Sequence, residues 1–81
     1  MTWKEKIMDY VSMFPGATDS DIVRYYKPPN PDGAHRTVNR ECRDLVRLGM
    51  LKRQSNPDKD GDIGNYPTNK ALEMSNRVRT E

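Results

Sequence analysis

The sequence predicts an α+β domain in which three helices come first, followed by a two-stranded hairpin and a last helix. Two observations carry this prediction. Apolar residues recur every three or four positions through residues 3–48, which is the period of amphipathic helices. After Gly49 the pattern changes to two short strand candidates, separated by a stretch dense in Asp, Asn, Pro and Gly.

The first helix is expected over residues 2–14. Its one-sided apolar stripe consists of Trp3, Ile7, Tyr10, Val11 and Phe14. Thr2 is a suitable N-cap, and Glu5 three residues later completes the pattern of a capping box. Pro15-Gly16 ends the helix. Because Trp3 belongs to this apolar stripe, we expect it to pack at the edge of the core and not to serve as a platform for stacked bases.

A second, shorter helix is expected to begin at Thr18 or Asp19. The segment Thr18-Asp19-Ser20-Asp21 has a capping-box pattern, and Ile22, Val23 and Tyr26 would form the inner face. Residues 27–31 (KPPNP) must end this helix, because consecutive prolines remove donors and push the preceding residues out of the helical region.

The third helix is expected from an N-cap at Asp32 through about Leu48, where Gly49 can stop it. Four arginines at spacings of four, three and four residues lie on one face: Arg36, Arg40, Arg43 and Arg47. The apolar residues expected on an opposite, buried face are Val38, Cys42, Leu45, Val46 and Leu48. A packed helix that shows a row of guanidinium groups to solvent suits phosphate and guanine edges.

The remaining elements follow from turn and cap signals. Strands are expected over residues 50–54 and 63–68, with Asp60-Gly61 as the hairpin turn. Thr68 or Asn69 can cap a last helix from Lys70 to about Val78. Residues 1–81 then make one domain, with a core over about residues 3–75.

Composition permits a folded domain with a thin core. Leu, Ile, Val and Phe total thirteen of 81 residues, but the net charge is only +2 and five Met, four Tyr and one Trp add apolar area. The charge is unevenly distributed. Residues 34–53 carry +4 and residues 1–21 carry −2, and such a local positive patch matters more for polyanion binding than the total.

Cysteine content and hydropathy indicate the compartment. Cys42 is the single cysteine, which excludes a disulfide framework and a thiolate zinc site and fits a reducing cytosol. No signal peptide is visible, and no apolar run approaches the ~20 residues that span a bilayer. We expect a cytoplasmic protein without a membrane partner.

Enzymatic, cofactor and metal chemistry have no support in the sequence. One His, one Cys without a base and scattered carboxylates do not assemble a catalytic group, and a Gly-rich phosphate loop is missing. Residues 58–62 (DKDGD) copy the first positions of an EF-hand loop, but Ile63 and Asn69 stand where glycine and glutamate are needed. We therefore expect no enzyme activity, no cofactor and no metal.

A family resemblance follows from residues 37–53 (TVNRECRDLVRLGMLKR) and 66–72 (YPTNKAL). The first stretch resembles the recognition helix of the winged helix-turn-helix domain of bacterial and archaeal transcription regulators. It also resembles the family's connection from this helix to the wing, which consists of a leucine, two further residues, a leucine-glycine pair and two apolar residues. The second is similar to the stretch after the wing, where a tyrosine strand meets a threonine-capped helix. The resemblance covers about residues 3–75 and predicts a helix-turn-helix core of three helices, a two-stranded wing and a C-terminal helix.

The resemblance implies a small transcription regulator that binds double-stranded DNA, with the helix of about residues 32–48 in the major groove. The residues it places at the DNA are His35, Arg36, Thr37, Asn39, Arg40, Arg43, Arg47, Lys52 and Arg53. Arg36, Asn39 and Arg40 are expected nearest the bases, and Arg43 on a phosphate or a base. Arg47 is expected at the DNA backbone or in solvent. Lys52 and Arg53 begin the wing and are expected to clamp a phosphate.

Departures from the family pattern leave alternatives open. Residues 27–33 form a longer, more proline-rich connection than usual, and the wing tip carries Asp58, Asp60 and Asp62, which repel phosphate. A winged-helix protein-interaction module without DNA binding, with a partner at the acidic wing, is the alternative. Exposed helical arginines are also commonly just solvated.

Two further alternatives concern the form of DNA and the oligomeric state. Val38-Asn39-Arg40 is similar to the recognition helix of Z-DNA-binding winged helices, but Arg43 stands where a tyrosine is wanted. Pairing of the last helix through Leu72, Met74 and Val78 would give a homodimer, and its apolar content is too sparse to decide.

Overall fold

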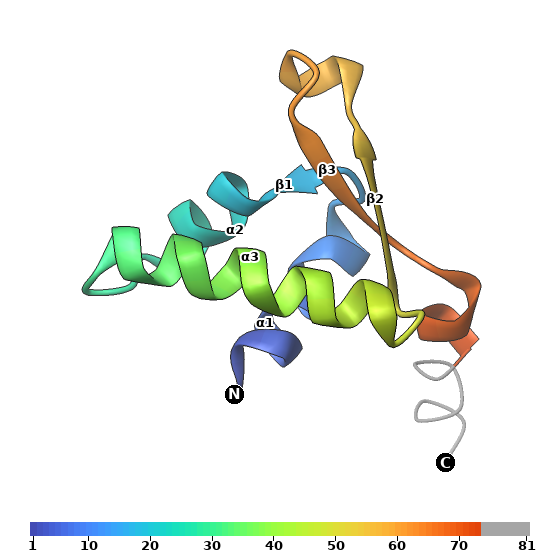
Figure 1. Ribbon diagram of the computed structural model, residues 1–81, viewed down its shortest axis with the longest axis horizontal. Helices are drawn as coiled ribbons and strands as arrows, with labels where there is room; N and C mark the ends of the chain where they lie inside the picture. Colours follow the sequence, from blue (N-terminus) through green and yellow to red (C-terminus); the bar gives the residue numbers. More distant parts are fainter. Residues whose placement is uncertain (74–81) are drawn as a thin grey trace.

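The described residues of the computed structural model, 1–73, form an α+β arrangement (Figure 1). The elements in chain order are α1 (Trp3–Met13), β1 (Ala17–Thr18), α2 (Asp19–Tyr26), α3 (Pro31–Arg47), β2 (Leu51–Ser55), the 3-10 helix η1 (Pro57–Lys59) and β3 (Ile63–Pro67). Residues 69–73 are again helical. The predicted order of three helices, a hairpin and a further helix is therefore confirmed as far as residue 73.

Side-chain caps start α1 and α2 at the residues that the sequence predicts. The Thr2 hydroxyl accepts from Glu5 N at 3.2 Å, and the Glu5 carboxylate accepts from Thr2 N at 2.9 Å. Thr18 and Asp21 exchange the equivalent pair of hydrogen bonds, both at 3.1 Å. Each box satisfies backbone donors that the first helical turn leaves free.

The start of α3 differs from the prediction. Asn30 is the N-cap and accepts from Gly33 N at 3.2 Å, so the expected cap at Asp32 is wrong. The reason is Pro31: its fixed φ and missing N–H suit the first helical position, which places the cap one residue before it. The helix ends at Arg47, one residue before the predicted Leu48, and Gly49 takes a left-handed φ of 77° just beyond.

The hairpin belongs to a three-stranded antiparallel sheet in the order β1-β3-β2. The sequence did not indicate β1, which is two residues long and pairs Thr18 with Gly64. A Cβ at Gly64 would lie 2.7 Å from the carbonyl oxygen of Gly16, so only glycine allows this approach. The strands β2 and β3 lie within one residue of the predicted bounds. Asp60 and Gly61 turn the chain with φ of 57° and 82°.

The core lies between the three helices and the sheet. The wholly buried side chains include Ile7, Val11, Ile22, Val38 and Cys42. On α3 the buried stripe is 34, 38, 42 and 45, which is narrower than predicted. Val46 and Leu48 are 40% and 54% exposed, so their assignment to the buried face is wrong. They lie beyond the edge of the stripe that packs against α1, α2 and β2.

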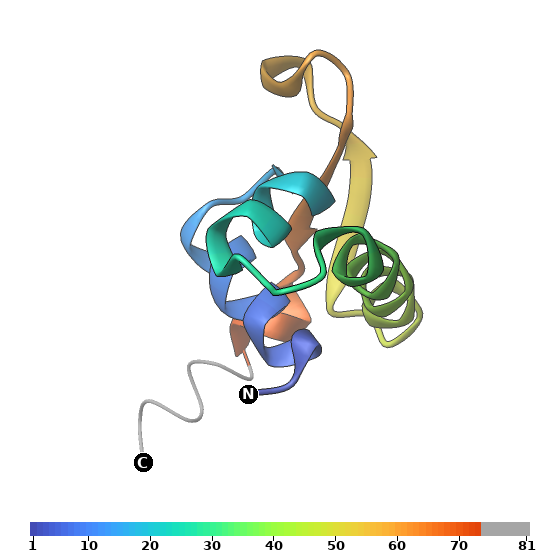
Figure 2. The ribbon, with the colours of Figure 1, turned by 90° about the vertical axis from the view of Figure 1, so that its left-hand side faces the viewer.

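The view along α3 shows α1 and α2 on one side of it, with the hairpin rising from beyond its C-terminus (Figure 2). Figure 1 shows α3 running across the domain, with its full length in view. The side of α3 that faces away from α1 and α2 is therefore not covered by another described element. It is the side on which the exposed arginines lie.

The beginning of the last helix agrees with the predicted cap. The Thr68 hydroxyl accepts from Ala71 N at 3.3 Å, and Ala71 is buried. The predicted continuation to Val78, with Met74 and Val78 as dimer contacts, lies outside the described residues. Among residues 1–73, no helix combines the length and the apolar character that crossing a membrane requires.

We predict that Ile7→Ala lowers the free energy of unfolding by about 2–5 kcal/mol, because it opens a cavity in a fully buried site. Ile63→Ala is the matched control, since Ile63 is 46% exposed, and it should cost less than about 1 kcal/mol. Urea unfolding followed by circular dichroism measures both. Equal losses for the two variants would contradict the assigned core.

Candidate nucleic-acid interface

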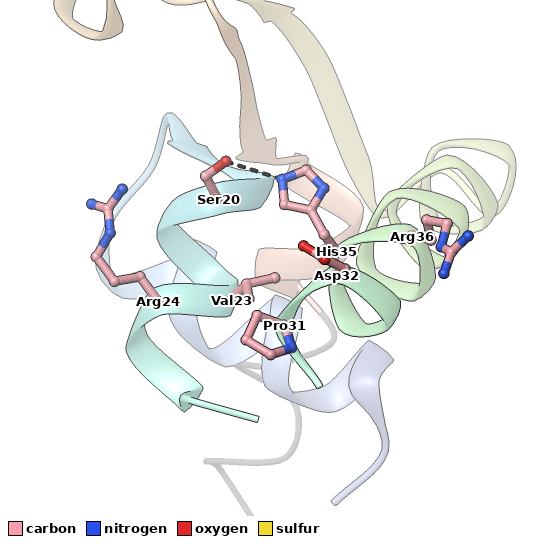
Figure 3. Close-up of a pocket in the computed structure, with 7 residues that line it drawn as sticks. All are labelled: Ser20, Val23, Arg24, Pro31, Asp32, His35 and Arg36. Atoms are coloured by element: carbon pink, nitrogen blue, oxygen red, sulfur yellow. Dashed lines mark hydrogen bonds between the residues drawn. The ribbon is translucent and has the colours of Figure 1, made fainter. Parts of the chain in front are cut away.

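The most strongly charged surface among the described residues follows α3. Arg36, Arg40, Arg43 and Arg47 are all exposed, and at 1.5 Å per residue their row is about 16 Å long. Figure 3 shows the Arg36 side chain directed away from α2. The structure therefore places the four arginines in one row on the uncovered side of the helix, as their spacing predicts.

Two of these four arginines have a carboxylate of α3 nearby, and two do not. Arg47 pairs with Asp44, and Arg40 Nε lies 3.6 Å from Glu41 Oε1. Among the described residues, Arg36 and Arg43 take part in no ion pair. Their guanidinium groups are therefore the most available to an external anion.

Lys4 of α1 draws the acidic residues of α3 toward the core side. Its ammonium group bonds to Glu41 and lies 3.6 Å from Asp44. The hydrogen bond from Lys4 lowers the pKa of Glu41, so this carboxylate stays ionised and paired. Glu41 and Asp44 thus have a counterion outside the arginine row, in addition to their contacts with Arg40 and Arg47.

A shallow, open groove of about 650 Å³ runs along the exposed surface of α3, and all of its lining residues belong to this helix. Its lining residues are Gly33, His35, Arg36, Thr37, Asn39, Arg40 and Arg43. Six of the nine predicted contact residues are therefore brought together here. Arg47 lies further along α3, and Lys52 and Arg53 lie on β2.

His35 and Thr37 have partners inside the domain. His35 Nε2 and Ser20 Oγ are 3.0 Å apart, which joins α3 to the start of α2 (Figure 3). The Thr37 hydroxyl donates to the carbonyl oxygen of Gly33 at 3.1 Å. His35 remains exposed at the surface, whereas Thr37 is half-buried, so Thr37 offers less to a ligand.

A second groove, of about 550 Å³, lies between α2 and the start of α3. Figure 3 shows that Arg24 and Arg36 at its rim point to opposite sides, with Val23 and Pro31 between them. The two cations therefore do not converge on a common anion in this groove.

Asn39 and Arg53 are held by the buried carboxylate of Asp19, the first residue of α2. Asn39 Nδ2 donates to Asp19 Oδ2 at 3.1 Å. Arg53 binds the same carboxylate in a bidentate manner, at 3.1 Å to Oδ1 and 3.3 Å to Oδ2. The amide of Asn65 on β3 donates to Asp19 Oδ1 and accepts from Arg53, both at 3.0 Å. We call these four residues the Asp19 network.

The Asp19 network is buried and complete. Asp19 is 7% and Asn65 0% exposed, and the Arg53 side chain is 17% exposed. Within the described residues, every buried side-chain nitrogen and oxygen has a hydrogen-bond partner. Arg53 thus has its guanidinium engaged inside the domain instead of presented to a phosphate, and Asn39 has one amide donor engaged. We therefore leave Arg53 out of the interface proposed below, whereas Asn39 still lines the groove along α3.

Burial and hydrogen bonding act in opposite directions on Asp19. Burial alone would raise the pKa of its carboxyl, but hydrogen bonds from Arg53, Asn65 and Asn39 outweigh this and hold the pKa below the ordinary value. Asp19 is therefore an anion at neutral pH, and its hydrogen bonds orient the side chains of Arg53, Asn39 and Asn65. Sequence reasoning missed Asp19 and Asn65, because their partners lie 20 to 46 residues away.

The hairpin loop, residues 56–62, is acidic and attached to the helices. Lys59 Nζ lies 3.3 Å from Asp21, and Asn56 Nδ2 donates to the Gly16 carbonyl oxygen at 2.9 Å. The predicted acidic tip, Asp58, Asp60 and Asp62, is exposed. In residues 1–73, no three His, Cys, Asp or Glu side chains gather as a metal site would require. Lys52 is exposed on β2.

Comparisons of this chain with protein-family models, with curated proteins and with solved structures give no match.

We predict that the Asp19 carboxyl titrates with a midpoint below 3.8, the ordinary value for Asp. Because its folded pKa is lowered, Asp19 contributes stability that is present above the unfolded pKa and lost as pH falls through the folded one. Carboxyl carbon NMR shifts of the folded protein, followed downward from pH 6 until the protein unfolds, give the midpoint or an upper bound on it. A midpoint at or above 3.8 would contradict the bonding described for Asp19.

Proposed function

We propose that this protein is a winged helix-turn-helix DNA-binding protein and acts as a small transcription regulator, with α3 in the major groove of double-stranded DNA. The observation that carries the proposal is the exposed row of arginines on the uncovered side of α3. An α-helix is about 10–12 Å wide and the major groove about 12 Å, so a helix with one free side can enter it.

Within this proposal the arginines have different tasks. Arg36 lies in the N-terminal half of α3 and Arg40 just past its midpoint, and both line the groove described above. We assign these two side chains to base edges, where Arg binds guanine O6 and N7. Arg43 contacts a phosphate or a base. Arg47 is paired with Asp44 at the end of the helix and contributes little beyond general attraction.

The hairpin acts as the wing in this proposal, and its charge limits the contact. Lys52 on β2 is exposed and can contact a phosphate. The three exposed carboxylates of the loop repel the backbone at low ionic strength. Binding is therefore concentrated on α3, and the acidic tip weakens it instead of adding to it.

A protein-interaction module remains the second candidate, because of a different surface. Met13, Phe14 and Tyr25 are each more than half exposed, and the ring centroids of Tyr10 and Phe14 lie 5.0 Å apart. Clustered exposed aromatic residues are typical of protein interfaces. This candidate predicts that the protein does not bind duplex DNA near physiological salt.

We predict that Arg36→Ala with Arg40→Ala weakens duplex binding about tenfold at low salt, because the variant lacks two cations that neutralise phosphates or bond to base edges. The dependence of log Kd on log salt should also become shallower, by up to about 2 units. Fluorescence anisotropy with a labelled random-sequence duplex at low and rising salt measures both quantities.

The matched control removes two positive charges elsewhere. Arg24→Ala with Lys27→Asn changes the net charge equally, and Asn tolerates the left-handed φ of 47° at position 27. This control should bind nearly as tightly as the parent. Equal effects of the two double variants would show that only net charge matters, and the role of α3 would be wrong.

We predict that neutralising the loop, as Asp58→Asn, Asp60→Asn and Asp62→Asn together, tightens duplex binding severalfold at low salt. The gain should fade as salt rises, since screening removes the repulsion. Unchanged affinity at low salt would place the hairpin tip far from the DNA and contradict its role as a wing.

A further inference from the structure

We propose that Asp19 is the positioning residue that fixes the angle between the hairpin and α3, and thereby sets how well both engage one duplex. This inference rests on the proposed function for its consequence in DNA binding. Its structural part concerns the folded chain alone and is tested without DNA.

The first support is that one carboxylate receives hydrogen bonds from three separate elements. Asp19 accepts from Asn39 of α3, from Arg53 of β2 and from Asn65 of β3, with four distances between 3.0 and 3.3 Å. Bidentate Arg–carboxylate pairs fix orientation as well as distance. The carboxylate is thus a common point of attachment for both strands of the hairpin and for the middle of α3.

The second support is that two attachments far apart define an angle. The base of the hairpin is joined to the end of α3, where Met50 N donates to the Leu45 carbonyl oxygen at 2.9 Å and Thr68 Oγ1 donates to the Gly49 carbonyl oxygen. Asn39 lies eight residues before Arg47, which is about 12 Å along the helix. The hairpin is also held on the α2 side by the β1–β3 pairing and by contacts of Asn56 and Lys59. Among the side-chain hydrogen bonds of residues 1–73, however, those that link the two strands to the middle of α3 run through Asp19.

The third support is that Asp19 itself is held in place. It is the first residue of α2, directly after the Thr18 cap and the β1–β3 pairing. Asn65 also donates to the Ala17 carbonyl oxygen at 3.0 Å. The position of the carboxylate is therefore set by backbone structure on the α2 side, and the hairpin and α3 adjust to it.

The test measures the distance between the hairpin loop and α3 with two spin labels, by pulsed electron paramagnetic resonance. Asp58→Cys and Val46→Cys supply exposed attachment points. Cys42 does not compete, because burial raises the pKa of its thiol to about 12. Five strand residues span about 17 Å, so a rotation of about 10° moves the loop by about 3 Å.

Two variants loosen the network, and one control destabilises the domain elsewhere. Asp19→Asn removes the negative charge of the network, whereas Asn39→Ala removes only its hydrogen bond to α3. If Asp19→Asn fails to fold, Asn39→Ala still tests the proposal. We expect each folded variant to shift or broaden the distance distribution by about 3 Å or more. Ile7→Val, a core change outside the network, should leave the distribution as in the parent. A parental distribution in Asn39→Ala would overturn the proposal.

Duplex affinity of the unlabelled proteins separates this inference from the proposed function. Asp19→Asn, where folded, should bind duplex about tenfold more weakly, because a loosened surface must be ordered on binding. Ile7→Val should bind like the parent. Unchanged affinity in a folded Asp19→Asn would overturn the positioning role. If the parent itself does not bind duplex, the proposed function fails, and the distance measurement alone decides whether Asp19 fixes the hairpin.

Discussion

The arrangement of this domain depends on the ionised carboxylate of Asp19. A buried carboxylate is stable only if its charge and lone pairs are satisfied, and here Arg53, Asn39 and Asn65 do this together. Loss of any one partner leaves a buried charge less well satisfied. The carboxylate therefore holds the start of α2, the middle of α3 and the strands β2 and β3 in one mutual arrangement. A thin apolar core alone would specify this arrangement less uniquely.

The Asp19 network also divides the polar residues of α3 and β2 into those that hold the domain together and those that face solvent. Arg53 and Asn39 belong to a stretch that would serve DNA binding by its composition, yet their side chains hold the domain together. Arg36 and Arg43 have no ion pair among the described residues and face solvent from the same helix. Lys4 of α1 pairs with Glu41 and Asp44, which lie between the arginine row and α1. The result is a helix with one structural side and one positively charged side.

The features that the sequence predicted correctly are local ones. The caps at Thr2 and Thr18 and the Asp60-Gly61 turn depend on residues within a few positions of one another. The predicted cap of α3 at Asp32 is wrong because Pro31, which helps to end the preceding helix, also suits the first position of the next one and so makes Asn30 the cap. The Asp19 network could not be predicted, because the partners of Asp19 lie 20 to 46 residues away from it and a lone Asp or Asn gives no periodic signal.

The central claim, that the free side of α3 binds duplex DNA, is tested most directly by amide NMR spectra recorded during titration with a duplex. The account predicts that shift changes concentrate in residues 35–43 and around Lys52, while the amides of Tyr10, Phe14 and Tyr25 stay unchanged. Unperturbed spectra at low salt would contradict the claim. Changes confined to the aromatic surface of α1 and α2 would contradict it as well and would favour a protein-interaction role.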